Sequence, residues 1–139
     1  METNPMSRKL STVVAAVIVF AIAAPIFAHH SFSAEYDNTK PITIKGKFTK
    51  MDWVNPHSWV HVDVVMPDGK TMNWAAETPP PNVLYRGGWR KDTLKPGQEV
   101  EIQGFSAKDG TAHMWASRVI DVPTGQAVLT MFAPNPNAK

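Results

Sequence analysis

The sequence predicts an all-β domain, a small five-stranded OB-like barrel with one short helix between its third and fourth strands. Three observations support this fold class. Short segments alternate apolar and polar residues with a period of two. Turn signals separate these segments, and a proline run at 79–81 ends the third one because proline cannot donate to a strand ladder. The 139 residues leave room for one small domain, and a seven-strand sandwich would not fit.

The first expected strand is long and bent. It opens at Pro41 and alternates through Ile42, Ile44 and Phe48 before continuing to Val54. Gly46 lies in its middle, where a glycine favours the bend or bulge that lets a sheet curl. The pair at 55–56, Asn-Pro, then marks a turn.

The second and third strands form a hairpin at residues 58–66 and 71–77. On the second strand, Val60, Val62 and Val64 share one face, which we assign to the core. Trp59 and His61 lie on the other face, so we expect the Trp59 ring to be exposed. Three other tryptophans, Trp53, Trp74 and Trp115, are assigned to the core.

The second half of the domain follows the same logic. A short helix is expected at 81–85 and is stopped by two glycines at 87–88. Strands are expected at 99–105 and 113–122, joined by a Lys-Asp-Gly turn at 108–110. The barrel domain therefore covers residues 41–122, and residues 123–139 form a C-terminal tail.

Residues 1–28 have the three parts of a secretory signal peptide. A basic segment at 7–9 precedes an apolar run at 10–24, then Pro25 and the small residue Ala28 suit cleavage. The run is shorter than the roughly 20 residues of a membrane-spanning helix. An uncleaved membrane anchor is the alternative. Cleavage would give a periplasmic or secreted protein with no stable membrane insertion, beginning with an N-terminal arm at 29–40 that Phe32 and Tyr36 pack onto the domain.

Composition excludes several classes of function. The formal net charge of +2 is too balanced for a nucleic-acid partner. The chain has no cysteine, so disulfides, thiolate ligands and thiolate nucleophiles are all absent. Its serines lack a nucleophile elbow, and no glycine loop cradles a phosphate. These absences favour a binding protein over an enzyme.

Several motifs in order carry a family resemblance. They are Ala-His-His-Ser-Phe at 28–32, Lys-Pro-Ile-Thr-Ile-Lys-Gly at 40–46, Trp-Val-Asn-Pro-His at 53–57, the segment 82–89 and Leu-Lys-Pro-Gly at 94–97. In these, the chain resembles a family of small exported bacterial domains of unknown function. The resemblance spans His29 to about Val122 and implies an envelope protein with a barrel-like domain. Three prolines at 79–81 depart from the more glycine- or serine-rich loop that the resemblance implies before the helix.

Histidine is the residue type that points to metal chemistry. Imidazole is the commonest transition-metal ligand, and His29 would become the N-terminal residue after cleavage. Its amino group and ring nitrogen can then chelate one copper ion, an arrangement that resembles the histidine brace of copper-dependent polysaccharide monooxygenases. The candidate metal ligands are His29, His30, His57 and His61. His57 and His61 are ~13 Å apart along an extended strand, so one ion cannot hold both unless the chain bends.

A ligand-binding face is the first functional hypothesis. The candidate binding residues are Asn55, His57, Trp59 and His61. OB barrels bind extended ligands across the second and third strands, and an aromatic platform there suits sugars or other planar, amphipathic groups. The sequence thus predicts an exported domain that binds an unidentified small ligand or envelope protein. Copper binding through His29 with His57 or His61 is the alternative, and an oxidative copper enzyme is the third hypothesis.

Overall fold

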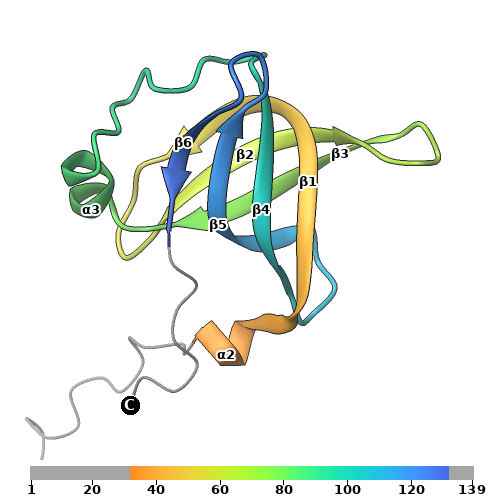
Figure 1. The fold of residues 1–139 in the computed structure, drawn as a ribbon. Coiled ribbons are helices and arrows are strands. Elements are labelled where there is room, and N and C mark those ends of the chain that lie inside the picture. The colour runs from red at the N-terminus through yellow and green to blue at the C-terminus, as the bar shows by residue number, and fades with distance from the viewer. Residues whose placement is uncertain (1–31, 132–139) are drawn as a thin grey trace, which may run out of the picture. The chain divides into compact units, whose positions relative to one another are not determined.

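The computed structural model describes residues 32–131, and these residues form a predominantly β structure (Figure 1). This confirms the all-β prediction. Two short helices and six strands make up the described part of the chain: α2 (Phe32–Glu35), β1 (Tyr36–Asp52), β2 (Ser58–Val65), β3 (Thr71–Thr78), α3 (Pro81–Arg86), β4 (Glu99–Ala107), β5 (His113–Asp121) and β6 (Gln126–Thr130). The predicted signal peptide at 1–28 and the histidines at 29 and 30 lie outside the described residues.

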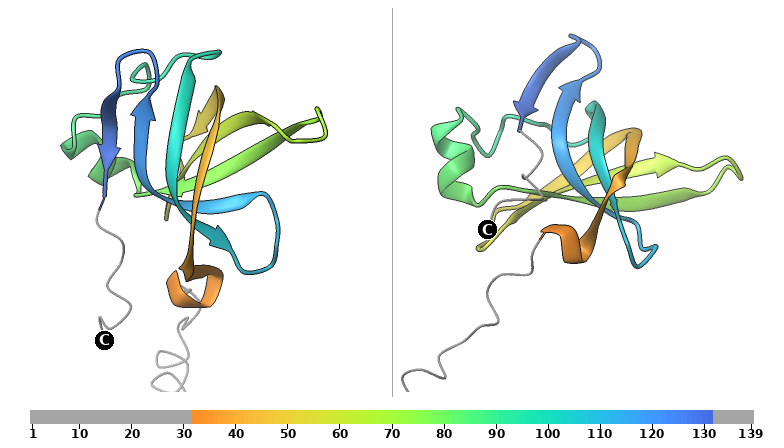
Figure 2. Two further views of the ribbon diagram at one scale, coloured as in Figure 1. Left: turned by 45° about the vertical axis from the view of Figure 1, so that its right-hand side comes forward. Right: turned by 60° about the horizontal axis from the view of Figure 1, so that its bottom comes forward.

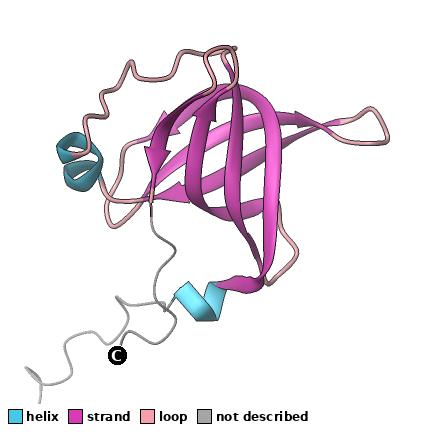
Figure 3. Cartoon of the chain, in the orientation of Figure 1, coloured by secondary structure: helices cyan, strands magenta, loops and turns pink. Residues whose placement is uncertain are grey.

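The strands form one six-stranded sheet in the order β3-β2-β1-β4-β5-β6. Neighbours in this order are antiparallel, and β3 also pairs in parallel with β5 at Ala75–His113, Ala76–Met114 and Glu77–Trp115. The first and fifth strands of this order, β3 and β5, are therefore hydrogen-bonded to each other. Figure 3 shows that strands make up most of the domain, with a helix at two separate places on its periphery.

Gly46 lies where β1 changes partner. Residues before it pair with β4, residues after it pair with β2, and Lys47 is opposite Glu99 on one side and Asp63 on the other. A Cβ atom on Gly46 would overlap the carbonyl oxygen of Asp63. The glycine is therefore required by the close approach of the β2 backbone, and the long curved β1 follows from it (Figure 1).

The main core lies between the inner faces of the strands. Val60 and Val62 are completely buried there, as the period-two pattern of β2 predicts, and Leu84 of α3 packs into the same core. Trp53 and Trp74 are partly buried against this core. Of the described helices, neither is long and apolar enough to cross a membrane.

Three details differ from the prediction. β1 begins at Tyr36 instead of Pro41, and the residues just before it form the helix α2. A sixth strand, β6, lies in the segment assigned to the tail, so the count of five strands is wrong. β6 forms because Val128 and Leu129 pack against the core and Trp89 Nε1 donates a hydrogen bond to the carbonyl oxygen of Val128.

Trp115 is the third difference. It is buried, yet it does not belong to the main core; it packs on the outer face of the sheet among the aromatic rings of α2, β1 and β4. In both views of Figure 2, the hairpin of β2 and β3 projects beyond the other strands. Val65 and Met72 on this hairpin are exposed, with 71% and 43% of their surface accessible.

Candidate functional site

A buried carboxylate marks the most unusual position in the domain. Glu77 is opposite Trp59 across the β2–β3 ladder, on the outer face of the sheet, but its side chain is only 5% exposed. The Tyr36 hydroxyl donates a hydrogen bond to Oε2 of Glu77, and Nδ1 of His57 contacts Oε1. Both carboxylate oxygens are therefore occupied, which is what a buried charge requires.

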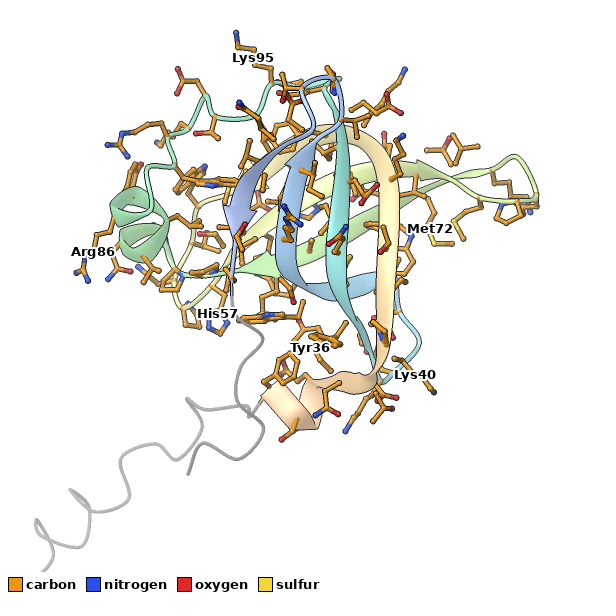
Figure 4. All side chains as sticks on the ribbon, viewed as in Figure 1. Tyr36, Lys40, His57, Met72, Arg86 and Lys95 are labelled. Atoms are coloured by element: carbon orange, nitrogen blue, oxygen red, sulfur yellow. The ribbon has the colours of Figure 1, made fainter. Side chains whose placement is uncertain are left out.

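Aromatic rings cover this carboxylate. The Tyr36 and Trp115 ring centroids are 6.0 Å apart, and the His57 ring meets the Trp115 ring edge-on, also at 6.0 Å. Phe32 of α2 stacks on Tyr36 at 5.6 Å and touches Trp115 at the same separation. We call Tyr36, His57, Glu77 and Trp115 the Glu77 cluster. Figure 4 shows Tyr36 and His57 at the end of the sheet where α2 lies.

The cluster changes the chemistry of Tyr36. Burial, followed by the hydrogen bond to the Glu77 carboxylate, raises the pKa of the Tyr36 hydroxyl well above its ordinary value. Tyr36 is therefore a hydrogen-bond donor at every physiological pH. Trp115 adds a buried indole N–H that has no hydrogen-bond partner among the described residues.

The start of the domain is fastened to the β4–β5 hairpin next to this cluster. The backbone N–H of Lys108 donates to the carbonyl oxygen of Glu35 at 2.9 Å, and Lys108 Nζ donates to that of Ser33 at 2.6 Å. Together with the Phe32 stacking, these contacts hold α2 in place. The expectation that Phe32 and Tyr36 pack the N-terminal segment onto the domain is confirmed.

His61 lies in a different network from His57. Its Nε2 is 2.9 Å from Oδ2 of Asp52, and its Nδ1 is 3.2 Å from Oδ1 of Asn73. Asn73 in turn donates through Nδ2 to Oδ1 of Asp63 at 2.8 Å. Hydrogen bonds from Lys50 and then from His61 hold the pKa of the Asp52 carboxyl below its usual value.

A hollow of about 600 Å³ opens beside the Glu77 cluster. Trp59 lies in its wall, half-buried, and its ring is 5.8 Å from that of His113. Its lining combines aromatic rings with charged side chains: Ala34, Glu35, Tyr36, Trp59, Ala107, Lys108, Asp109 and His113. Tyr36 belongs to both the hollow and the Glu77 cluster, so a ligand in the hollow would lie close to the buried carboxylate.

A second aromatic surface lies by α3. Trp53 stacks on Tyr85 with ring centroids 5.0 Å apart, and the Arg90 guanidinium is 5.7 Å from the Tyr85 centroid. Val54 and Val83 are exposed nearby along the chain. A hollow of about 500 Å³ adjoins Trp53 and is lined by Lys91, Leu94 and Pro96 on its other side. Arg86 points away from the sheet (Figure 4).

The structure places the predicted binding residues in different surroundings. Trp59 lies in the wall of the hollow, His57 in the Glu77 cluster and His61 in the Asp52 network. Asn55 is exposed in the turn between β1 and β2, where its peptide bond with Pro56 is cis. Within residues 32–131, no three His, Cys, Asp or Glu side chains are grouped to hold a metal ion.

Sequence reasoning misses the central residue of the cluster. Glu77 is not among the predicted binding residues, because carboxylates on strands are usually solvated. One signal is present in the sequence: Glu77 stands between two alanines at 75–76 and a Thr-Pro run, in a stretch with no other charged residue. For Tyr36 the sequence predicts only that it packs the arm onto the domain, since the segment around it has no clear period that would assign its hydroxyl a partner.

The model of a family of unknown function, DUF6152, matches residues 16–116 of the chain. No curated protein matches the chain.

Proposed function

The chain belongs to DUF6152, a family of unknown function, and from its sequence and geometry we propose that it is an exported, OB-like barrel that acts as a small ligand-binding or accessory domain of the cell envelope. The single observation that carries the binding function is the 600 Å³ hollow, whose aromatic wall includes Tyr36, the residue that donates a hydrogen bond to the buried Glu77. The barrel, the export and the binding are separate parts of this proposal.

The strand pairings support the barrel. Leaving β6 aside, the order β3-β2-β1-β4-β5 returns to β3 through the parallel β3–β5 pair. The long β1 passes from β4 to β2 at a glycine, and a short helix lies between β3 and β4. These are features of a five-stranded, partly open OB barrel.

Export rests on the sequence at 1–28. The test is to express the full chain in a bacterium, separate the periplasmic from the cytoplasmic fraction, and read the N-terminus of the purified protein by mass spectrometry. We expect a periplasmic product that begins at His29. An intact N-terminus in the membrane fraction would favour the anchored alternative, and a cytoplasmic product would refute export.

Binding in the hollow is tested through Trp59. An aromatic ring flanked by polar side chains suits sugars and other planar, amphipathic groups. We would titrate a soluble N-acetylglucosamine trisaccharide, as one envelope sugar, by calorimetry and tryptophan fluorescence. Trp59→Ala should abolish the signal, whereas Tyr85→Ala, which changes an exposed ring outside the hollow, should preserve it. Equal binding by wild type and Trp59→Ala would refute this location for the site.

Copper binding is the second candidate function, and one observation favours it. Phe32, three residues after His29, packs on the same Trp115 ring as His57. The test uses a chain that begins at His29. Sub-micromolar Cu(II) binding by this form, lost when one extra residue precedes His29, is the expected result. Unchanged binding by the extended form would refute the N-terminal chelate.

A further inference from the structure

Exposed apolar side chains gather around α3. Of the five large apolar residues that are exposed in the described part of the chain, two lie on α3 itself, Val83 and Tyr85, and one, Val54, follows Trp53 in the turn between β1 and β2. Trp53 stacks on Tyr85, so this turn and the helix are in contact. In Figures 1 and 2, α3 lies outside the layer of strands. These side chains therefore form a protruding apolar surface.

Positive charge follows the same surface. Residues 81–97, which contain α3 and its connection to β4, carry four Lys or Arg and one Asp. The other described residues carry seven Lys or Arg and ten Asp or Glu, so the net charge with neutral histidines is +3 in this segment and −3 in the rest. The charge extends from Arg86 on α3 to Lys95 near the end of the connection (Figure 4). An anionic partner would be attracted to this side of the domain.

The cations of this segment are free to bind such a partner. Within residues 32–131 none of the four is in a salt bridge, although four lysines elsewhere in this range each pair with a carboxylate: Lys40, Lys45, Lys50 and Lys70. The charge on the segment is therefore not neutralised by the fold.

Arg90 joins the charged and the apolar parts of the surface. Its guanidinium is 5.7 Å from the Tyr85 centroid, and Nη1 donates to the carbonyl oxygens of Tyr85 at 3.0 Å and Trp89 at 2.7 Å. These contacts hold the guanidinium beside the aromatic pair, while Nε and Nη2 have no acceptor among the described residues. The free edge of a planar guanidinium binds a phosphate through two parallel hydrogen bonds.

We propose that this surface docks the domain on an anionic phospholipid bilayer. We call it the α3 patch and define it by the exposed apolar and basic side chains just described: Val54, Val83, Tyr85, Arg86, Arg90 and Lys91. Aromatic rings favour the membrane–water interface, exposed valines enter the boundary of the acyl chains, and Lys and Arg are attracted to anionic headgroups.

The shape of the patch favours a bilayer over an acidic protein. An acidic protein would account for the cations, but it would need a pocket matched to the protruding valines. A fluid bilayer accepts a protruding apolar surface without such a match. The α3 patch shares no residue with the 600 Å³ hollow, so this inference stands apart from the proposed ligand binding.

The experiment measures partition into lipid vesicles by cosedimentation and by the blue shift of tryptophan fluorescence. The chain begins at His29, so that the apolar run at 10–24 cannot itself enter the bilayer, and it keeps every described residue. The vesicles contain phosphatidylcholine alone or phosphatidylcholine mixed with phosphatidylglycerol. Near-UV circular dichroism confirms that each variant is folded.

Two pairs of variants separate the patch from the rest of the surface. The patch variant removes three charges of the α3 patch: Arg86→Gln, Arg90→Gln and Lys91→Gln. The matched control removes three charges from exposed lysines elsewhere and so has the same net charge: Lys40→Gln, Lys45→Gln and Lys70→Gln. The second pair changes one exposed valine each, Val54→Ser in the patch and Val65→Ser on the β2–β3 hairpin.

We expect wild type to bind the vesicles that contain phosphatidylglycerol and not those of phosphatidylcholine alone. Each Lys or Arg near an anionic surface contributes about fivefold to the partition coefficient, so the patch variant should bind roughly 100-fold more weakly and the control within about fivefold of wild type. Val54→Ser should weaken binding about three- to tenfold, because it removes a side chain that the bilayer buries, whereas Val65→Ser should leave binding unchanged.

Four results would overturn the proposal. Wild type that does not bind phosphatidylglycerol vesicles would do so directly. An equal loss in the patch variant and its control would show attraction by net charge alone. Displacement from the vesicles by inorganic phosphate at constant ionic strength would indicate a site for free phosphate. Equally tight binding to soluble poly-glutamate, unaffected by Val54→Ser, would identify an acidic protein as the partner. None of these results bears on ligand binding in the hollow.

Discussion

The hydrogen bond between Tyr36 and Glu77 can be tested by a double-mutant cycle. Tyr36→Phe removes one of the two donors to a buried carboxylate, and a hydrogen bond to a charged group contributes about 2 kcal/mol to the free energy of unfolding. Glu77→Leu leaves the buried Tyr36 hydroxyl without its acceptor, which also costs about 2 kcal/mol. The His57 ring, at 41% exposed, can turn to water and adds little.

Combining the two substitutions removes both unpaired groups at once. If the effects were independent, the double variant would be about 4 kcal/mol less stable than wild type. We expect a loss of about 1 kcal/mol instead, because an apolar pair of similar shape can replace a buried polar pair at little cost. The coupling energy is then about 3 kcal/mol. Urea unfolding followed by circular dichroism measures it, and additivity within about 0.5 kcal/mol would refute the hydrogen bond.

Three further predictions concern the fold and its pH dependence. Folding raises the pKa of the Tyr36 hydroxyl, so its contribution to the free energy of unfolding is fully present below roughly pH 10 and is lost as the pH rises above it. Tyr36→Phe should therefore flatten the decline in stability between about pH 10 and 11.5. An equal slope in both proteins would contradict this. Val60→Ala should cost about 2 kcal/mol in urea unfolding, since Val60 is completely buried, whereas Val65→Ala on the same strand, 71% exposed, should change stability by less than about 0.5 kcal/mol. Gly104→Ala would press a Cβ atom into the Trp115 carbonyl and should lower the free energy of unfolding by more than about 3 kcal/mol. Gly110→Ala, at φ 76° in open space, should lower it by about 1–2 kcal/mol. Comparable urea-unfolding midpoints for the two glycine variants would argue against the close approach of β4 and β5.

Much of the strand pattern was predictable because it depends on local chemistry. Period-two alternation, the Pro-Asp-Gly-Lys turn at 67–70 and the proline run at 79–81 each depend on neighbours in the chain, and β2, β3 and α3 lie within a residue of the predicted bounds. β6 was missed because the contacts that order it come from residues far away in the sequence. Val128 and Leu129 are ordered by the core and by Trp89, which is 39 residues away along the chain.

The candidate site was predictable only in part, for the same reason. The outward direction of Trp59 and His61 followed from alternation with the buried valines of β2. The burial of Glu77 depends on the rings of Tyr36 and Trp115, which come from strands that no local pattern brings to that corner. The separation of His57 from His61 likewise depends on Glu77 and Asp52, which are their respective partners.

The cost of burying Glu77 bears on why the position holds a carboxylate at all. Desolvating a charge is unfavourable, and an apolar side chain at this position, with phenylalanine in place of Tyr36, would pack there without that cost. Stability alone therefore does not account for the residue. What Glu77 provides, and leucine cannot, is an acceptor that fixes the proton on Nδ1 of the half-exposed His57. If the double variant that combines Tyr36→Phe with Glu77→Leu retains most of its stability, folding does not require the carboxylate. Its role is then to orient the half-exposed His57 ring or to act, through Tyr36, on a ligand in the adjacent hollow.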